Sequence, residues 1–172
     1  NGWNVQGVDP TKSSNKYASE NYNILVQEEE FSEIKFDEKF DVITFWGVLE
    51  HLSTPLEAIN KAKNLINGGG VIVFEVPSSD CFLSEYLKKY PFGATRYIES
   101  GRHNIFFSKK VIDIIAIEQN MEIALIETNG LDVQTILMEE CGTEMTEKML
   151  NIQDIINDLL MGDHYRVFLK DV

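Results

Sequence analysis

Two apolar segments joined by a well-marked helix constrain the fold of this chain more than any other feature. Residues 40–46 form a nearly continuous apolar run, which is typical of a strand buried on both faces at the centre of a parallel sheet. A helix follows, with Thr54 at its N-cap, Pro55 at its first position and an acidic residue three positions after the cap. Three glycines at 68–70 should end this helix, and residues 71–76 form a second apolar strand. The sequence therefore predicts a βαβ unit and an α/β fold.

The rest of the chain continues this alternation. Residues 10–21 are polar enough for a solvated helix or a loop, and residues 78–107 are aromatic and irregular, as expected of a lid or substrate segment. Ser108 is placed to cap a helix. The further elements that we expect are strands at 4–8 and 23–27, a helix at 108–119, a strand at 121–128, a helix at 144–160 and a last strand at 165–169.

Length and charge limit the class of protein. A chain of 172 residues with 44% apolar residues is long enough for one domain with a substantial core and too short for two, so we expect residues 1–172 to form a single domain. The 15 basic and 28 acidic side chains give a formal charge of −13. Because binding to nucleic acid needs clustered Lys and Arg, this balance argues against a nucleic-acid partner.

The two cysteines and the apolar runs bear on where the protein works. Cys81 and Cys141 lie far apart without metal-ligand spacing, so we expect reduced thiols rather than a zinc site or a disulfide. No run approaches the length of a membrane span, and the start of the chain lacks a signal pattern. The prediction is a cytoplasmic protein with no membrane partner. Since Asn1 opens directly into a strand pattern, we also expect the chain to begin inside a longer polypeptide.

Candidate functional residues follow the expected strands, where ligands bind in open α/β sheets. Asp9 closes the first strand and is suited to hold ribose hydroxyls, although an Asp-Pro turn explains it as well. Gly47 follows the most apolar strand and permits close approach of a ligand to the backbone. Glu50 and His51 offer an acid/base pair, and His103 offers a second imidazole able to accept a proton near neutral pH. A purely structural role remains open for each of these three side chains.

Several of these segments, in this order, carry a family resemblance. Residues 2–10 (GWNVQGVDP), 40–55 (FDVITFWGVLEHLSTP) and 65–70 (LINGGG) resemble successive motifs of class I S-adenosylmethionine (SAM)-dependent methyltransferases. Residues 103–108 (HNIFFS) resemble a later motif of the subgroup that includes small-molecule methyltransferases of the ubiquinone-biosynthesis type. The resemblance extends over about residues 2–128.

The resemblance implies a Rossmann-like, mostly parallel sheet of order 3-2-1-4-5-7-6 with the last strand antiparallel, and SAM as cofactor. Asp9 would end the second strand and hold the ribose of SAM. Trp46 and Gly47 would lie along the methionine and adenosyl parts, and Glu28 or Glu29 would lie near the adenine. The family's first strand and its glycine-rich loop have no counterpart in the chain. We therefore expect them before Asn1, and we expect these 172 residues alone to bind SAM weakly and to be inactive.

The implied reaction is methyl transfer to an O, N or C atom of a small molecule by in-line displacement, a step that depends mainly on positioning. If the acceptor is a hydroxyl, His51 or His103 is the candidate base. Only Glu50 and His51 stand together as possible metal ligands, so we predict no metal requirement.

Two other functions remain possible from the sequence. An NAD-dependent dehydrogenase or sugar-nucleotide enzyme would share the acidic residue after the second strand, but Tyr86 is not followed by a lysine at the spacing such enzymes use. A non-catalytic interaction module would keep the methyltransferase fold without the glycine-rich loop. The sequence does not indicate an oligomeric state.

Overall fold

The structure is a computed structural model that describes residues 2–89, 103–130, 132–142 and 146–172. The chain divides into two compact units, Asn1–Lys39 and Phe40–Val172. Among the helices of the described residues, none has the length and apolar character needed to cross a membrane.

The first unit contains a parallel pair of short strands and one helix. Strands β1 (Gly7–Val8) and β2 (Val26–Gln27) pair in parallel, and helix α1 (Lys12–Tyr22) connects them. The helix ends at Asn23, which takes the left-handed conformation common at helix C-termini. Both strands occur where the sequence predicts them but are shorter, and the polar connection, predicted as helix or loop, is a helix.

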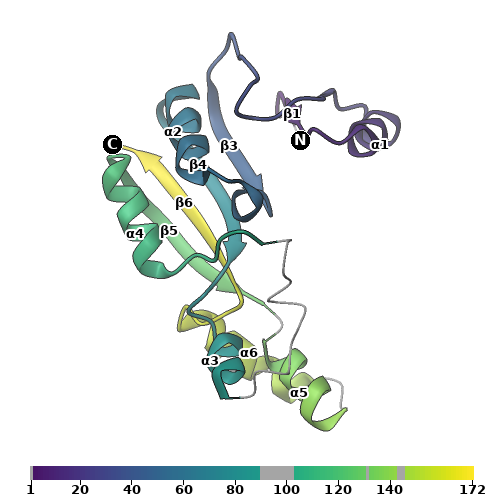
Figure 1. Cartoon of the computed structure of the whole chain (residues 1–172), viewed down its shortest axis with the longest axis vertical. Coiled ribbons are helices and arrows are strands. Elements are labelled where there is room, and N and C mark those ends of the chain that lie inside the picture. Colours follow the sequence, from purple (N-terminus) through teal and green to yellow (C-terminus); the bar gives the residue numbers. More distant parts are fainter. Residues whose placement is uncertain (1, 90–102, 131, 143–145) are drawn as a thin grey trace. The chain divides into compact units, whose positions relative to one another are not determined.

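The second unit is built on a four-stranded mixed sheet (Figure 1). Its strands are β3 (Phe40–Trp46), β4 (Ile66–Pro77), β5 (Met121–Asn129) and β6 (His164–Asp171), in the order β3-β4-β6-β5. β3 and β4 are parallel, whereas β6 is antiparallel to both of its neighbours. This is the 4-5-7-6 part of the expected order, and the predicted fold class with its antiparallel last strand is confirmed.

The core of this unit is centred on β4 and β6. Ile72, Phe74 and Val76 alternate along β4 and are fully buried. Their partners on β6, which are Leu169, Val167 and Tyr165, are buried as well. Helices α2 (Pro55–Leu65) and α4 (Lys109–Glu118) add buried aliphatic side chains against β4 and β5. Both helices begin where the sequence predicts, and the Ser108 side chain accepts a hydrogen bond from the Val111 backbone N–H, as expected of an N-cap.

The glycine run was expected to end α2, and this expectation is wrong. The helix ends at Leu65, and β4 already begins at Ile66, so the glycines lie inside the strand. The pairing of β3 with β4 passes from Phe40–Ile66 to Val42–Val71, which leaves the glycines in an irregular, bulged stretch. A Cβ at Gly70 would stand 2.9 Å from the Asn67 carbonyl oxygen, so this bulge requires a residue without a side chain.

The expected burial of β3 on both faces is also wrong. β3 is an edge strand of the four-stranded sheet, and no other strand of the described residues pairs with its free edge. Phe45 is buried, but Val42 and Trp46 are 37% and 52% exposed. An apolar run predicts a strand, but the burial of that strand depends on its neighbours in space.

The segments after β4 and β5 contain more helix than expected. Helix α3 (Phe82–Lys89) lies within the predicted lid at 78–107, of which residues 90–102 are outside the described residues. Helix α5 (Asp132–Cys141) was not predicted. Helix α6 (Glu147–Asp158) corresponds to the predicted helix at 144–160, whose first two residues are also outside the described residues.

Candidate active site

One edge of the four-stranded sheet gathers most of the candidate residues. β3 and β4 end at this edge, and the antiparallel β6 begins there. Trp46 on β3 pairs with Glu75 on β4, which in turn pairs with Arg166 on β6. Ligands of open α/β sheets bind beyond such carboxyl ends. This edge is therefore the candidate ligand-binding site of the second unit.

Trp46 and Gly47 form an accessible surface at the end of β3. The Trp46 ring is half exposed, and the Arg166 guanidinium lies over it, 5.4 Å from the ring centroid. Gly47 follows with φ of +61°, a conformation that residues with a Cβ seldom adopt. A flat, partly apolar ligand can stack on such a ring while its polar groups approach the glycine backbone.

Glu50, His51 and His103 lie together immediately after β3. Glu50 and His51 belong to the 3₁₀ helix η1 (Leu49–His51). Glu50 Oε1 lies 3.7 Å from His51 Nε2, and the His51 and His103 rings are 5.2 Å apart between centroids. One nitrogen or oxygen donor from each of the three residues lies within 4.8 Å of the others. The fold thus brings together both histidines that the sequence proposed as bases.

Backbone hydrogen bonds hold these two distant segments against each other. The backbone N–H groups of Asn104 and Ile105 donate to the Glu50 carbonyl oxygen at 2.9 and 3.3 Å. The Asn104 side-chain amide donates to the His51 carbonyl oxygen at 2.8 Å. The His103 ring also meets the Phe106 ring edge-on at 5.7 Å. The approach of His103 to His51 is therefore fixed by several contacts.

Two polar atoms of this cluster are buried without a hydrogen-bond partner. They are Oε2 of Glu50 and Nδ1 of His103. A buried acceptor left without a partner costs free energy, about 1–3 kcal/mol for an ordinary group, and more when it is charged. Such atoms in a native site call for an explanation, such as strain, a catalytic role or a bound water or ion. One carboxylate and two imidazoles are also donors that a transition metal accepts. The sequence-based expectation that no metal is required stays a prediction.

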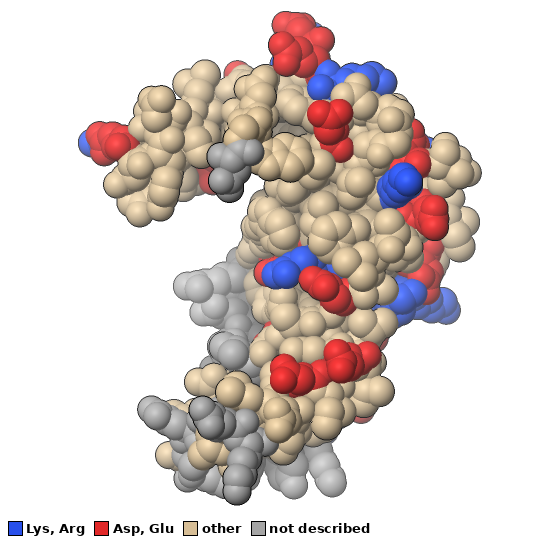
Figure 2. Space-filling model, turned by 180° about the vertical axis from the view of Figure 1, so that it is seen from behind, with Lys and Arg blue, Asp and Glu red and all other residues tan. Residues whose placement is uncertain are grey.

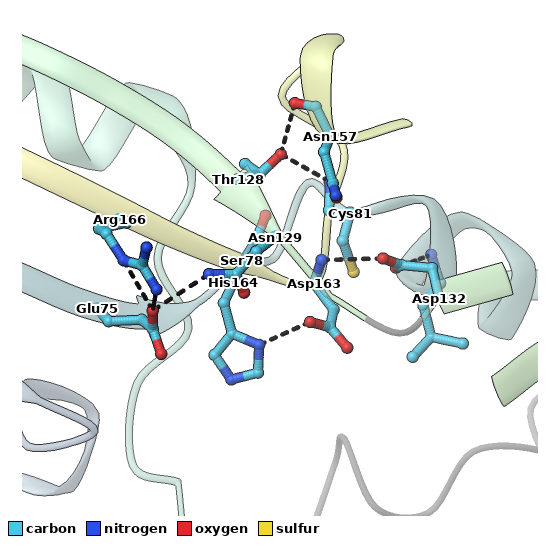
Figure 3. Close-up of polar contacts among 12 residues, drawn as sticks. Glu75, Ser78, Cys81, Thr128, Asn129, Asp132, Asn157, Asp163, His164 and Arg166 are labelled. Carbon is cyan, nitrogen blue, oxygen red and sulfur yellow. Dashed lines mark hydrogen bonds and ion pairs between the residues drawn. The ribbon is translucent and has the colours of Figure 1, made fainter. Parts of the chain in front are cut away.

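A second polar network covers the same edge of the sheet further along (Figure 3). Arg166 donates through Nε and Nη2 to Glu75 Oε2 at 3.1 and 2.6 Å. Its Nη1 donates to Glu127 Oε1 at 3.3 Å. Asn129 donates to the same Glu75 oxygen at 3.2 Å. The hydrogen bonds to Glu75 raise the pKa of Arg166 further above its ordinary value. Glu75 thus fixes the cation that lies over Trp46.

Asp132, Asp163 and His164 form a further set of polar contacts, in which both carboxylates are buried (Figure 3). The His164 Nδ1–H donates to Asp163 Oδ1 at 2.6 Å, and this bond raises the pKa of His164 although burial opposes the shift. Asp132 is fully buried and accepts hydrogen bonds from the backbone N–H groups of Leu83 and Asp163 and from the Gln153 amide. Burial, with the nearby Asp163 carboxylate, raises the pKa of Asp132. The network joins α3, α5 and α6 to the start of β6.

The first unit places the other two candidate cofactor residues at the ends of its strands. Asp9 directly follows β1, and its Oδ1 accepts a hydrogen bond from the Thr11 backbone N–H at 2.7 Å. This is the turn contact that the Asp-Pro pair suggested, and it occupies one of the two carboxylate oxygens. Glu28 directly follows β2 and forms an exposed ion pair with Lys12 at 3.5 Å.

A comparison with known protein families decides the class. A sequence model described as a methyltransferase domain matches residues 1–123, which is well over half of the chain. The chain belongs to this methyltransferase family. The predicted family, the enzyme class and SAM as methyl donor are thereby confirmed. No protein of curated function matches the sequence.

Solved structures of low sequence identity share the fold of this methyltransferase. A SAM-dependent methyltransferase of Thermotoga maritima, described as a possible histamine N-methyltransferase, superposes with a TM-score of 0.66 at 14% identity, over 97% of this chain and 72% of the other. The N-methyltransferase NodS of Bradyrhizobium japonicum, solved with S-adenosylhomocysteine (SAH), gives 0.57 at 13% identity over 96% and 65%. The [4+2]-cyclase SpnF gives 0.63 at 12% identity over 99% and 67%. At such identities the likeness shows the fold alone.

Sequence reasoning missed the polar network of the sheet edge. Glu75 and Arg166 lie within strands that were judged by their apolar residues. Asp163 and His164 follow Gly162, just before the last predicted strand. Because β6 is antiparallel to its neighbours, its first residues lie at the ligand-binding edge. The polar pair Asp163 and His164 just before the predicted strand could therefore have indicated a site there. Asp132 had no such signal, because α5 itself was not predicted.

Proposed function

We propose that this methyltransferase transfers the methyl group of SAM to a small molecule bound beyond the edge of the four-stranded sheet. The observation that carries this proposal is the adjacency of Trp46 and Gly47 to the Glu50, His51 and His103 cluster. A Cβ placed at Gly47 would stand 3.6 Å from Glu50 Oε1, so the surface suited to the cofactor continues directly into the surface suited to proton transfer.

The residues present fit SAM. The half-exposed Trp46 ring offers a face for stacking, and Gly47 leaves the backbone open to close approach. Asp9 keeps one carboxylate oxygen for ribose hydroxyls while the other holds the turn. Glu28, next to the end of β2, is our proposed contact for the adenine side. When bound, SAM supplies an electrophilic methyl group on a positively charged sulfur.

The chain's own residues then hold the acceptor in line and keep its charges compensated. In-line displacement gains most of its rate from positioning. The edge of the four-stranded sheet, with its hydrogen-bonded cluster of Glu50, His51 and His103, can supply such positioning. We assign His51 and His103 to the acceptor side of the site. The Arg166 guanidinium, held by Glu75, lies over the Trp46 ring.

Charge supports a small molecule rather than nucleic acid as acceptor. The formal charge is −13, and on the face drawn in Figure 2 the described Lys and Arg side chains lie beside acidic ones rather than in a broad basic patch. Two of the superposed structures are described as N-methyltransferases, one of them possibly acting on histamine. A cytoplasmic location, with Cys81 as a buried, reduced thiol, is part of the same proposal.

The test is transfer of label from methyl-labelled SAM. The complete natural polypeptide is incubated with labelled SAM and the small-molecule fraction of the organism that encodes it, beside samples of its RNA and of its protein. We expect an enzyme-dependent label in a compound of low molecular mass. Label that appears only in RNA or protein, or no enzyme-dependent label at all, would contradict the proposal.

A further inference from the structure

We propose that Glu50, His51 and His103 form a proton-accepting site in which His51 is the base, positioned by Glu50 and His103, and that the methyl acceptor is therefore a hydroxyl or an amine bearing N–H. The inference rests on the proposed function, because it concerns the acceptor side of the same site. It narrows the acceptor to groups that both lose a proton on methylation and donate a hydrogen bond, which excludes thioethers, tertiary amines and carbon acceptors.

Exposure distinguishes the roles within the cluster. The His51 side chain is 45% exposed, so an acceptor can reach it, whereas the Glu50 side chain is 4% exposed. A buried carboxylate beside an imidazole favours one orientation of the ring, as in other base–carboxylate pairs. The 3.7 Å separation is longer than a hydrogen bond, but such contacts often tighten only when the substrate binds. Glu50 is thus a positioning residue for His51.

His103 closes the other side of the cluster. Its ring packs against the His51 ring, and the bonds from Asn104 and Ile105 to the Glu50 carbonyl hold it there. Its buried Nδ1 has no hydrogen-bond partner, and neither has Glu50 Oε2. Glu50 Oε2 is an acceptor, and His103 Nδ1 is one when the ring carries its proton on Nε2, so the cluster suits a ligand that brings a hydrogen-bond donor. An O–H or N–H group of the acceptor is such a donor, whereas a thioether is not.

The cluster of Glu50, His51 and His103 also lies next to the proposed cofactor contact, as a base that accepts the proton of the methyl acceptor must. Gly47, our proposed contact of the cofactor, is next to the Glu50 carboxylate in space. In the reaction, a lone pair of the acceptor's oxygen or nitrogen forms the new bond to the methyl carbon. The carbon–sulfur bond breaks with its electron pair going to sulfur, which becomes the neutral thioether of SAH. The proton of the acceptor passes to a ring nitrogen of His51, and then to solvent through its exposed side.

The experiment compares His51→Gln and Glu50→Gln with the control Glu57→Gln, an exposed glutamate of α2. With the labelled product of the transfer assay, we expect kcat to fall about 10²- to 10⁴-fold in His51→Gln, the usual contribution of a general base. KM for SAM and the affinity for SAH should stay within about twofold. Added imidazole should partly restore a His51→Ala variant. Unchanged kcat in His51→Gln would overturn the proposal.

A second readout tests Glu50 without turnover. The ¹⁵N NMR signals of the His51 ring report its tautomer, and we expect them to change in Glu50→Gln but not in Glu57→Gln. A purely structural glutamate would lower stability without changing the tautomer. Identical ring signals in all three proteins would remove Glu50 as a positioning residue.

The nature of the product and a metal titration complete the test. The new methyl group should be attached to oxygen or to nitrogen, and a methyl group found on sulfur or carbon would overturn the acceptor class. Calorimetric titration with zinc chloride alone should show no one-to-one site that depends on His51 and His103. A one-to-one site lost in both histidine variants would overturn the base assignment in favour of a metal centre. Loss of SAM binding in the unaltered protein would instead refute the proposed function.

Discussion

Glu50 Oε1 lies 3.7 Å from Nε2 of its sequence neighbour His51, within a 3₁₀ helix that begins two residues after Gly47. Adjacent residues on extended backbone point in opposite directions. The tight turn after β3 instead turns both side chains toward one cluster, which His103 completes from a distant segment. The turn therefore links the sheet edge, the proposed cofactor contact and the proposed base.

Gly47→Ala should weaken both folding and SAM binding. The left-handed φ of +61° costs a residue with a Cβ about 1–2 kcal/mol, and the added methyl group faces the proposed cofactor surface. Urea unfolding and SAH calorimetry measure the two effects. Gly68→Ala is the matched control, because its φ is not left-handed and nothing lies within 4 Å of the added Cβ. Equal effects of the two substitutions would mean that the Gly47 conformation has no special role.

Asp132→Asn should destabilise the second unit by about 1–3 kcal/mol at neutral pH. The two Asp132 oxygens accept hydrogen bonds from Leu83, Gln153 and Asp163, and an amide would turn a donor toward one of these N–H groups. Denaturant unfolding measures the change. Asp154→Asn, at an exposed position of α6, should change stability by less than about 0.5 kcal/mol. A loss as small in Asp132→Asn would show that the buried network contributes little.

His164 should make stability depend on pH. Its pKa is raised in the folded state by Asp163, so its contribution is fully present below the ordinary histidine value, about 6.5, and is lost as pH rises through the raised folded value. The difference in unfolding free energy between the unaltered protein and His164→Gln should therefore be largest in mild acid and shrink above neutral pH. Urea titrations across this range measure it. A difference that grows with pH would contradict the assignment.

Local signals predicted most of the regular elements. Pro55 and Ser108 mark the N-termini of α2 and α4, because helix starts depend on residues close in sequence. Thr54 stands at the N-cap position of α2, but its side chain makes no capping hydrogen bond there, unlike that of Ser108. The sheet order and the antiparallel β6 came from the family resemblance rather than from any local pattern. The Gly68–Gly70 run was misread because glycine marks both helix ends and bulges.

Non-local packing explains what the sequence did not predict. His103 is held next to His51 by hydrogen bonds from Asn104 to the carbonyl oxygens of Glu50 and His51. No spacing in the sequence indicates that these two segments meet. The pairing of Arg166 with Glu75 likewise depends on strand register. The sequence identified His51 because it follows a strand, and His103 because it lies near the end of the predicted lid. That the two side chains lie next to each other could be seen only in the folded structure.

SAH binding by the complete natural polypeptide tests the central claim most directly, measured by calorimetry beside Asp9→Ala and the control Asp37→Ala, an exposed residue of the same unit. A carboxylate that holds both ribose hydroxyls forms charge-assisted hydrogen bonds, each worth about 1.5–3 kcal/mol. We predict micromolar binding that falls at least about tenfold in Asp9→Ala and is unchanged in Asp37→Ala. Absence of SAH binding to the unaltered protein, or equal affinity in all three proteins, would contradict the account.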